Sequence, residues 1–444
     1  MKRRQFFKSS LLGAAAIGAP FILPSGRLFA KTQNVRANHV VVVIFGGGIR
    51  QQESVLQRYL SGSQNEDIPG NILPNLFSGA LPDEKVAFGT DGTRPGEHPI
   101  APLLTRSLQE QGVLFREMRT QHVAHYGGLN VCVQGANFST QGLKQRPVYP
   151  TMFEYIRRHG GFPASKVWFV GSGIGNSVPL LNASEHPDYG AAYGANFLAP
   201  SITFSEEGTQ HLSLSEGFHP EFEMDPISKM KFFLDSRFQL EASPMRGIQN
   251  TEEEQEEIHS FLKDLFEKKK NRQIIQPLVR DNPDLRTIGY ACEVMARFKP
   301  NLLLINLENA DICHSNFTEY LKQLHRADHA VGFLWDYIQR EIPEMADETV
   351  LLLSPECGRN LDPNPIRDEN DWFAYDHSDE NAHRIFGMMV GKDVPQGLEL
   401  GDENRPIGMN ADLVPTVADI LGVKDAVMGK GFIDSAAKSW YDRM

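Results

Sequence analysis

Residues able to bind a metal ion gather in one short segment of this 444-residue chain. Asp311 and His314 lie shortly after the apolar run 302–307, which Glu308 follows directly. Carboxylate oxygens and imidazole nitrogens together are ligands of zinc, manganese or iron. The alternative is an ordinary polar loop. The position after a buried run favours a metal site, because ligands of open α/β sheets bind beyond the carboxyl ends of the strands.

A second segment follows the apolar run 350–353 and contains Glu356, Cys357 and Arg359. The carboxylate and the thiol could both face a metal ion in the adjoining loop. The planar guanidinium of Arg359 suits phosphate or sulfate, so it is a candidate for binding an anionic substrate oxygen. The alternative is a salt bridge beside a buried structural thiol.

A third segment precedes the apolar run 385–390 and contains Asp376, His377 and His383. These three potential ligands form the densest such grouping in the chain. A lone histidine is usually an ordinary core or surface residue. Three separate loops that each carry a carboxylate or a histidine predict a metal centre if the fold brings them together.

Two further segments offer residues with catalytic potential. His122 and His125 precede a glycine pair and are candidates for a base, a nucleophile or a metal ligand, or for histidines that line a helix start. Arg50 follows the glycines 46–48 and is a second candidate for binding an anion. These glycines allow a tight turn or a close ligand, but they lack the spacing of a dinucleotide fingerprint.

The segment 317–339 is predicted to be a long amphipathic helix. His325 and His329 lie four apart and therefore share a face, a spacing that can bind zinc. Because Lys322 and Arg326 neighbour them, we expect that face to be exposed to solvent. Asp328 lies on the apolar stripe, where a buried carboxylate needs an arginine or backbone donors as its partner.

Five short apolar runs predict buried strands, because a parallel sheet covered on both faces requires continuous apolarity. They are 40–45, 167–170, 302–307, 350–353 and 385–390. Helical patterns alternate with them, including 317–339 and 413–423. This alternation predicts an α/β fold with a mostly parallel central sheet in a three-layer α/β/α arrangement. The interval 172–284 breaks the rhythm and is interpreted as an insertion over the sheet, with a lid as one interpretation.

The first thirty residues are predicted to be a twin-arginine export signal. Arg3 and Arg4 precede the apolar run 11–23, and a small residue, Ala30, ends the segment. The prediction places the domain 31–444 in the periplasm or outside the cell, with the twin-arginine translocon as a partner during export. The alternative is an uncleaved anchor. The apolar run is short for a membrane span, and no later stretch is long and apolar enough for one.

Charge and cysteine content exclude some classes of function. The formal net charge is −12, and the first thirty residues hold five basic residues and no acid, so their removal gives −17. Such an acidic chain is a poor nucleic-acid binder, because binding to nucleic-acid phosphates needs clustered Lys and Arg. The four cysteines show neither a zinc-ribbon spacing nor a disulfide framework. A Cys313–Cys357 disulfide is the alternative to metal binding, in a purely architectural protein.

The order of these pieces resembles the alkaline phosphatase superfamily, which includes sulfatases, phosphodiesterases and cofactor-independent phosphoglycerate mutases. The most specific piece is "ADLVPTVADILGV" at 411–423, which is similar to a sulfatase-type ending. The segment "YPTMFEYIRRHG" at 149–160 looks like the helix after the nucleophile region. With the export signal, the chain looks closest to exported sulfatase-like members. The resemblance covers most of residues 38–435, apart from the interval 172–284.

This resemblance implies two nearby metal ions, usually zinc, that position a Ser or Thr nucleophile. The acid-plus-histidine loop matches with a spacing of three where the family usually has four. Glu356 and Cys357 occupy the places of Asp and His in the family motif S-D-H-G. The residues that correspond to family ligands are Asp311, His314, Glu356, Cys357, and either His383 or His377.

Two departures from the family pattern bear on activity. Glycines 46–48 stand where the family has its first metal-binding Asp, and His125 lies near the expected nucleophile position. One hypothesis is a metal-dependent hydrolase of small phosphate or sulfate esters, with one or two divalent ions and with Asp376 among the ligands. The alternative is a degenerate member that binds a ligand or partner without turnover.

Overall fold

The computed structural model describes residues 21–22, 28–29, 35–61, 66–82, 99–137, 146–171, 177–204, 251–277 and 282–444. Most of the predicted export signal therefore lies outside the described residues. Only the two-residue strands β1 (Phe21–Ile22) and β2 (Leu28–Phe29) are described within it. Among the described residues, none of the helices has the length and apolarity needed to span a bilayer.

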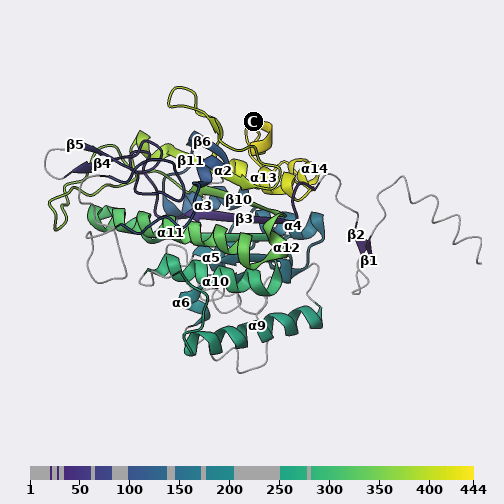
Figure 1. Ribbon diagram of the computed structural model, residues 1–444. Helices are drawn as coiled ribbons and strands as arrows, with labels where there is room; N and C mark the ends of the chain where they lie inside the picture. Colours follow the sequence, from purple (N-terminus) through teal and green to yellow (C-terminus); the bar gives the residue numbers. More distant parts are fainter. Residues whose placement is uncertain are drawn as a thin grey trace, which may run out of the picture.

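An eight-stranded sheet forms the centre of the fold (Figure 1). All five predicted strands are confirmed, and β11 alone runs against the other seven. The strand order across the sheet is β12 (Leu398–Leu400), β6 (Gly112–Arg119), β11 (Arg384–Gly391), β10 (Thr349–Pro355), β3 (His39–Phe45), β9 (Leu302–Leu307), β7 (Val167–Val170) and β8 (Asn196–Leu198). A separate two-stranded sheet joins β4 (Arg58–Ser61) to β5 (Glu66–Pro69).

The central strands are buried on both faces, as their continuous apolarity predicts. Every residue of β3 and β10 is buried, and the two strands pair in parallel from His39 opposite Thr349 to Phe45 opposite Pro355. Alternate residues of β3 belong to two separate hydrophobic clusters, one on each face of the sheet. Burial of each such valine or leucine contributes roughly 1.5–3 kcal/mol to folding.

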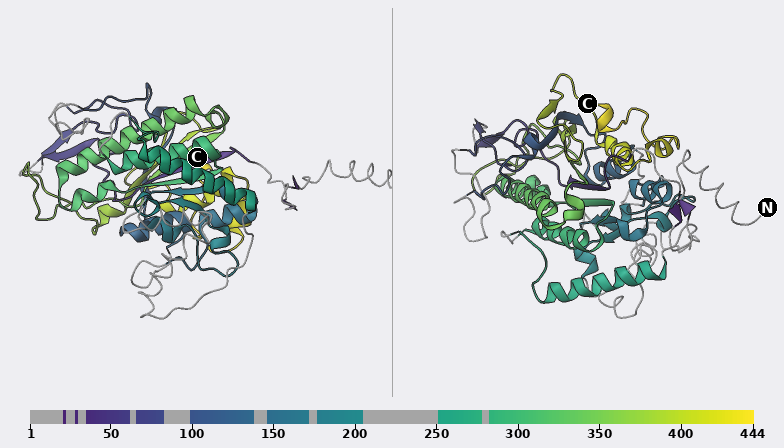
Figure 2. Two further views of the ribbon diagram at one scale, coloured as in Figure 1. Left: turned by 90° about the horizontal axis from the view of Figure 1, so that it is seen from below. Right: turned by 45° about the vertical axis from the view of Figure 1, so that its right-hand side comes forward.

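Helices cover both faces, which confirms the predicted three-layer α/β/α architecture (Figures 1 and 2). On one face lie α9 (Glu252–Lys270), α10 (Pro283–Phe298), α11 (Phe317–Glu341) and α12 (Pro343–Ala346). On the other lie α3 (His125–Gln134), α4 (Met152–Gly160), α5 (Ser177–Leu181), α13 (Leu413–Ile420) and α14 (Lys424–Met428). Two further short helices are α2 (Leu108–Gln111) and α6 (Pro200–Thr203).

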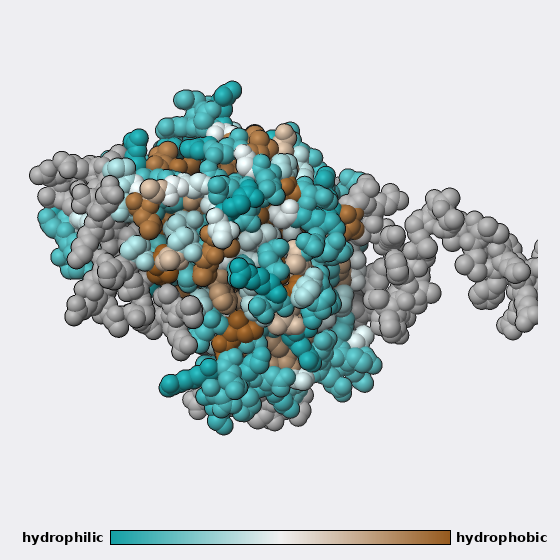
Figure 3. Space-filling model, viewed as in Figure 1, coloured by the Kyte–Doolittle hydropathy of each residue, from teal (hydrophilic) through white to brown (hydrophobic). Residues whose placement is uncertain are grey.

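The interval 172–284 contributes to the sheet as well as to its cover. Strand β8 pairs in parallel with β7 and forms one edge of the sheet, and α9 packs its apolar side on the same core as α10. Helix α9 begins with a capping box between Thr251 and Glu254. Its outer surface is mainly hydrophilic (Figure 3). Residues 172–176, 205–250 and 278–281 lie outside the described residues, so the interpretation as an insertion with a lid stays a prediction.

The expectation that His325 and His329 face solvent is wrong, because their side chains are buried with 1% and 4% exposure. Segments far away in the sequence cover this face of α11. His325 Nδ1 lies 2.7 Å from the Ile72 carbonyl oxygen, and its Nε2 accepts from the Ile100 amide at 2.8 Å. The cover comes from residues more than 200 positions upstream, which a local pattern of charges could not reveal.

Asp328 is buried and has backbone donors as partners, which is one of the two expected solutions. Its carboxylate accepts from the backbone amides of Asn75 and Leu76 at 2.8–3.1 Å and from Asn75 Nδ2 at 2.7 Å. Burial raises the pKa of Asp328 to about 7, although these hydrogen bonds favour the charged form. The carboxylate therefore joins α11 to the segment 66–82.

Candidate metal centre

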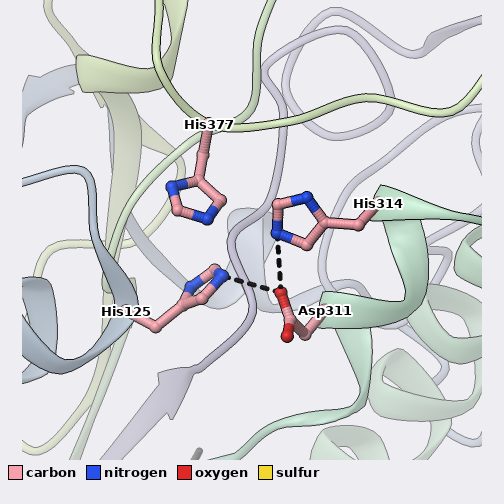
Figure 4. Close-up of side chains that lie close together, drawn as sticks. All are labelled: His125, Asp311, His314 and His377. Carbon is pink, nitrogen blue, oxygen red and sulfur yellow. Dashed lines mark ion pairs between the residues drawn. The ribbon is translucent and has the colours of Figure 1, made fainter. Parts of the chain in front are cut away.

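The candidate residues converge at one edge of the sheet because of the direction of β11. The parallel strands β9 and β10 end at this edge, and the antiparallel β11 begins there. The loop 356–383 that joins β10 to β11 therefore stays at the same edge as the 3₁₀ helix η4 (Asn309–His314). The first turn of α3 completes the group (Figure 4). This is the carboxyl edge, where open α/β sheets bind their ligands.

Four side chains offer donor atoms that all lie within 4.8 Å of one another: His125, Asp311, His314 and His377. Asp311 Oδ1 is 2.7 Å from His125 Nε2 and 3.2 Å from His314 Nε2. The ring centroids of His377 and His125 are 4.2 Å apart, and those of His377 and His314 are 4.8 Å apart. Figure 4 shows the three rings and the carboxylate around a common space.

Asp311 carries the carboxylate at the centre of this group. Burial would raise its pKa, but the contacts with His125 and His314 outweigh that effect and hold the pKa of Asp311 well below its usual range. Arg359 Nη2 also lies 2.9 Å from Oδ1. The side chain of Asp311 keeps 35% exposure, and that of His314 keeps 36%. The group can therefore be reached from solvent.

His125 is the first residue of α3 and contacts acidic groups through both ring nitrogens. Its Nδ1 lies 2.7 Å from Glu356 Oε1, and its Nε2 faces Asp311. Burial alone would lower the pKa of His125, but the contacts with Asp311, Cys357 and Glu356 raise it to about 12. The Nε2 atom is buried and makes no well-aligned hydrogen bond, although Asp311 Oδ1 is close. The two atoms form a close ion pair, and both are of the types that bind a metal ion.

A second group of donors consists of His125 itself with Glu356 and Cys357, which are fully buried and lie on the Nδ1 side of the His125 ring. Cys357 Sγ is 3.7 Å from His125 Nδ1. Glu356 Oε1 also accepts from the Gly47 amide at 2.8 Å. Burial raises the pKa of the Cys357 thiol. His125 thus lies between the two groups that the sequence predicts as metal ligands.

Asp376 contacts His314 on the side that faces away from the shared space. Its Oδ1 lies 2.6 Å from His314 Nδ1, while His314 Nε2 faces Asp311. Asn364 Nδ2 donates to the same Asp376 oxygen at 3.1 Å and to the His314 carbonyl at 3.0 Å. Asn364 is not among the site residues predicted from the sequence. Its only sequence signal is a polar residue within a proline-rich loop.

His377 is the histidine of the third segment that joins the group. Burial lowers the pKa of His377 to about 4, and the neighbouring charges of His125 and Arg359 act in the same direction. Its Nδ1 is buried without a hydrogen-bond partner. His383 points elsewhere, with Nδ1 3.0 Å from the Thr120 carbonyl oxygen. Of the two histidines proposed for the last ligand position, the structure brings only His377 to the others.

Three other candidate residues lie outside the group of donors. His122 precedes α3, and its Nδ1 accepts from the Ala124 amide at 3.1 Å, which fits a histidine that lines a helix start. Arg359 is buried, with 0% exposure, and donates to Gly47 and other backbone carbonyls as well as to Asp311. Arg50 is buried in an ion pair with Glu53. Both arginines are thus engaged inside the protein.

Glycines 46–48 stand where the sequence resemblance leads one to expect a metal-binding Asp, and the structure leaves no room there for a side chain. A Cβ atom at Gly46 would lie 2.5 Å from the Leu307 carbonyl oxygen, and one at Gly47 would lie 2.3 Å from the Asp311 amide nitrogen. Gly47 and Gly48 have φ angles of 91° and 76°, which strain any residue with a side chain. Side chains are therefore sterically excluded at Gly46 and Gly47.

All four cysteines are buried free thiols. The alternative of an architectural Cys313–Cys357 disulfide is therefore wrong. Cys313 is a buried residue of η4, and the amide of Tyr375 donates to its carbonyl oxygen at 2.9 Å. Burial raises the pKa of the Cys313 thiol to about 12. Cys357 is the cysteine that belongs to a group of donors at the candidate centre.

No protein-family model and no curated protein matches this chain. Among solved structures, a protein of the alkaline phosphatase superfamily from Vibrio parahaemolyticus is similar, with 11% identity and a TM-score of 0.40 over 95% of this chain and 76% of that chain. The lipoteichoic acid synthase LtaP from Listeria monocytogenes has 10% identity and a TM-score of 0.41, over 96% and 79%. The PsFucS1 sulfatase from Pseudoalteromonas sp. has 13% identity and a TM-score of 0.42, over 88% and 69%. The similar structures thus include the superfamily that the sequence resembles.

Proposed function

We propose that this chain is an exported, metal-dependent hydrolase of phosphate or sulfate esters. The observation that carries the proposal is the meeting of four donors from three separate segments within 4.8 Å at the carboxyl edge of the sheet. Three imidazoles and one carboxylate suit zinc, and also iron or manganese. We propose a divalent ion, zinc in the first place, and a small anionic ester as the substrate.

The residues present fit a divalent cation on two counts. The buried Nε2 atom of His125 lacks an aligned hydrogen-bond partner and lies 2.7 Å from Asp311 Oδ1, and a cation bound between these side chains would satisfy it. The carboxylates of Asp311, Glu356 and Asp376 carry three negative charges around these rings, and the guanidinium of Arg359 carries one positive charge. The net charge of these four groups is therefore −2. A bound divalent ion would supply positive charge for an anionic ester and lower the pKa of a water molecule.

The chain's own residues would hold and orient this centre. Asp311 and His314 are about one-third exposed, so an ester can approach from solvent without an opening of the core. Arg359 holds the Asp311 carboxylate from the buried side at 2.9 Å. This position supports a role for Arg359 in fixing a ligand, in place of the role in anion binding that its sequence position predicts.

A second candidate function is a degenerate member that binds a ligand or partner without turnover. The observation that favours it concerns His125, which lies near the expected nucleophile position. Both of its ring nitrogens contact acidic groups, so neither is free to attack a substrate. Arg50 and Arg359 are both buried, so neither offers a free guanidinium to an anion. This candidate keeps the metal site and predicts no hydrolysis.

Two measurements on the purified full chain separate these candidates. Inductively coupled plasma mass spectrometry measures bound metal, and a screen with aryl phosphates, phosphodiesters and aryl sulfates measures turnover. Hydrolysis that needs the metal and is lost in Asp311→Asn supports the hydrolase. Bound metal without turnover of any ester class supports the binding protein. A chain that binds no transition metal, even after reconstitution, refutes both metal-based functions.

Export is tested separately by replacing Arg3 and Arg4 with lysine. We expect the wild-type chain in the periplasmic or secreted fraction and the double variant in the cytoplasm, because twin-arginine signals depend on the arginine pair. Equal distribution of the two forms would contradict this route of export.

A further inference from the structure

We propose that the centre holds a single divalent ion between His125, Asp311, His314 and His377, and that Glu356 and Asp376 position histidines without binding the ion. This inference rests on the metal site of the proposed function. It departs from the two-ion arrangement that the sequence resemblance implies, in which Glu356 and Cys357 would bind a second ion. Its first consequence is that Glu356 and Asp376, both expected as ligands, are positioning residues.

The first argument is the orientation of the two histidine rings. His125 and His314 each direct Nε2 toward Asp311 Oδ1, at 2.7 Å and 3.2 Å. Each ring directs Nδ1 toward a different carboxylate, Glu356 at 2.7 Å and Asp376 at 2.6 Å. Histidine ligands commonly donate their second ring N–H to a carboxylate, which fixes the ring and strengthens the ligand. The same arrangement at both rings marks their Nε2 atoms as the ligand atoms.

The second argument is the space beside Glu356. Glu356 Oε1 already faces two groups, the Gly47 amide at 2.8 Å and His125 Nδ1 at 2.7 Å. The backbone of the glycine segment also lies against Cys357, since a Cβ atom at Gly48 would be 3.1 Å from its Sγ atom and 2.8 Å from the Gly358 carbonyl oxygen. His125 Nδ1 is the third donor beside Glu356 and Cys357. A ring that binds the first ion through Nε2 keeps its proton on Nδ1, which leaves only Glu356 and Cys357 for a second ion.

The third argument is the balance of charge. Asp311, Glu356 and Asp376 carry three negative charges, and Arg359 carries one positive charge at 2.9 Å from Asp311. With neutral imidazoles, one divalent ion brings the group to zero. A second divalent ion, with Cys357 bound to it as a thiolate, would leave an excess of one positive charge next to the fully buried Arg359. Burial of uncompensated charge is costly, so this group favours one ion.

The test is a titration of the metal-stripped full chain with Zn²⁺ and with Co²⁺. We expect one equivalent of either ion by calorimetry, and a Co²⁺ spectrum without a thiolate charge-transfer band. Cys357→Ser should leave the Co²⁺ spectrum unchanged. Glu356→Gln and Asp376→Asn should keep the stoichiometry of one while weakening affinity by roughly 10–100-fold, as for other partners of histidine ligands. Asp311→Asn should abolish specific binding.

Two controls separate positioning from misfolding. Asp376 is 44% exposed, so its substitution should leave the fold intact even if Glu356→Gln fails to fold. Glu344→Gln removes an exposed acid that precedes β10 at the opposite edge of the sheet, and it should leave affinity unchanged. Unchanged circular dichroism with weaker Zn²⁺ binding in Asp376→Asn supports the proposal, whereas unchanged binding refutes its positioning role.

The outcomes also distinguish this inference from the function on which it rests. Binding of two equivalents, or a thiolate band that Cys357→Ser removes, would overturn the single-ion proposal and leave the metal-dependent hydrolase standing. If the wild type binds two equivalents of metal ion and Glu356→Gln binds only one, the single-ion proposal is likewise overturned and the metal-dependent hydrolase still stands. A chain that binds neither Zn²⁺ nor Co²⁺ would overturn both.

Discussion

We predict that His325→Gln weakens the dependence of folding stability on pH. The buried His325 ring donates from Nδ1 to the Ile72 carbonyl oxygen and accepts at Nε2 from the Ile100 amide. Both bonds require the neutral ring with its proton on Nδ1. Burial lowers the pKa of His325 from 6.5 to about 4, with the neighbouring charges of His329 and Arg326 as smaller causes. Protonation would break the bond from Ile100 and bury a charge.

The sign and size of the effect follow from this lowered pKa. Because the folded state holds the proton more weakly, His325 stabilises the fold fully above pH 6.5, and this contribution is lost as the pH falls toward 4. Each pH unit in that window is worth about 1.4 kcal/mol. The wild-type chain should therefore lose about 2 kcal/mol of unfolding free energy through this residue between about pH 6.5 and about pH 5. Glutamine cannot titrate, and its side-chain oxygen can still accept from Ile100.

The assay is urea unfolding of both chains at about pH 7.5 and about pH 5, followed by circular dichroism. At the higher pH the variant should be less stable by about 1–3 kcal/mol, because the Ile72 carbonyl loses its donor. At the lower pH this difference should shrink by about 2 kcal/mol. Both chains contain the same other titrating groups, so the effects of these groups cancel in the difference between the two unfolding free energies. A difference that stays the same at both pH values would refute this account of His325.

Two further predictions concern the centre itself. Zn²⁺ at about 100 times its dissociation constant should raise the unfolding free energy of the wild type by about 2.7 kcal/mol, and Asp311→Asn should remove this gain while His383→Gln keeps it. Equal stabilisation of the Asp311 variant would contradict the assigned ligand. Gly47→Ala should destabilise the fold by about 2–4 kcal/mol, because its Cβ atom would meet the Asp311 amide at a positive φ. Gly397→Ala is the matched control, because Gly397 has a positive φ and open space around its Cβ position. An equal loss of unfolding free energy in both variants would show that the clash with the Asp311 amide is not the cause.

The layers of the fold could be predicted from local patterns. The run 40–45 and the run 302–307 are continuously apolar, and this marks strands covered on both faces. The long helix was predicted from its apolar stripe and ends within two residues of the predicted boundary. Three strands of the central sheet were missed. β8 and β12 have three residues each, too few for a periodic pattern, and the apolar run of β6 is interrupted by charged residues.

The direction of β11 could not be predicted, and the site depends on it. Five buried runs in alternation with helices predict parallel strands, yet β11 pairs antiparallel to both of its neighbours. In a parallel strand, the residues before it would lie at the opposite edge from Asp311. The reversed strand brings His377 to the carboxyl edge, where its ring centroid lies 4.8 Å from that of His314.

Residue types after each strand were enough to nominate Asp311, His314, Glu356, Asp376 and His377 as parts of one site, because donor chemistry and position along the chain are properties of sequence. Contacts between distant segments decide the rest. They set which nitrogen of each histidine faces the shared space, which carboxylate lies behind its ring, and which histidines are buried. His125 meets Asp311 and Glu356 across separations of 186 and 231 residues, and no local pattern encodes such distances. The contacts of the first residue of α3 with the segments that follow β9 and β10 therefore set the order of donors and partners at this edge.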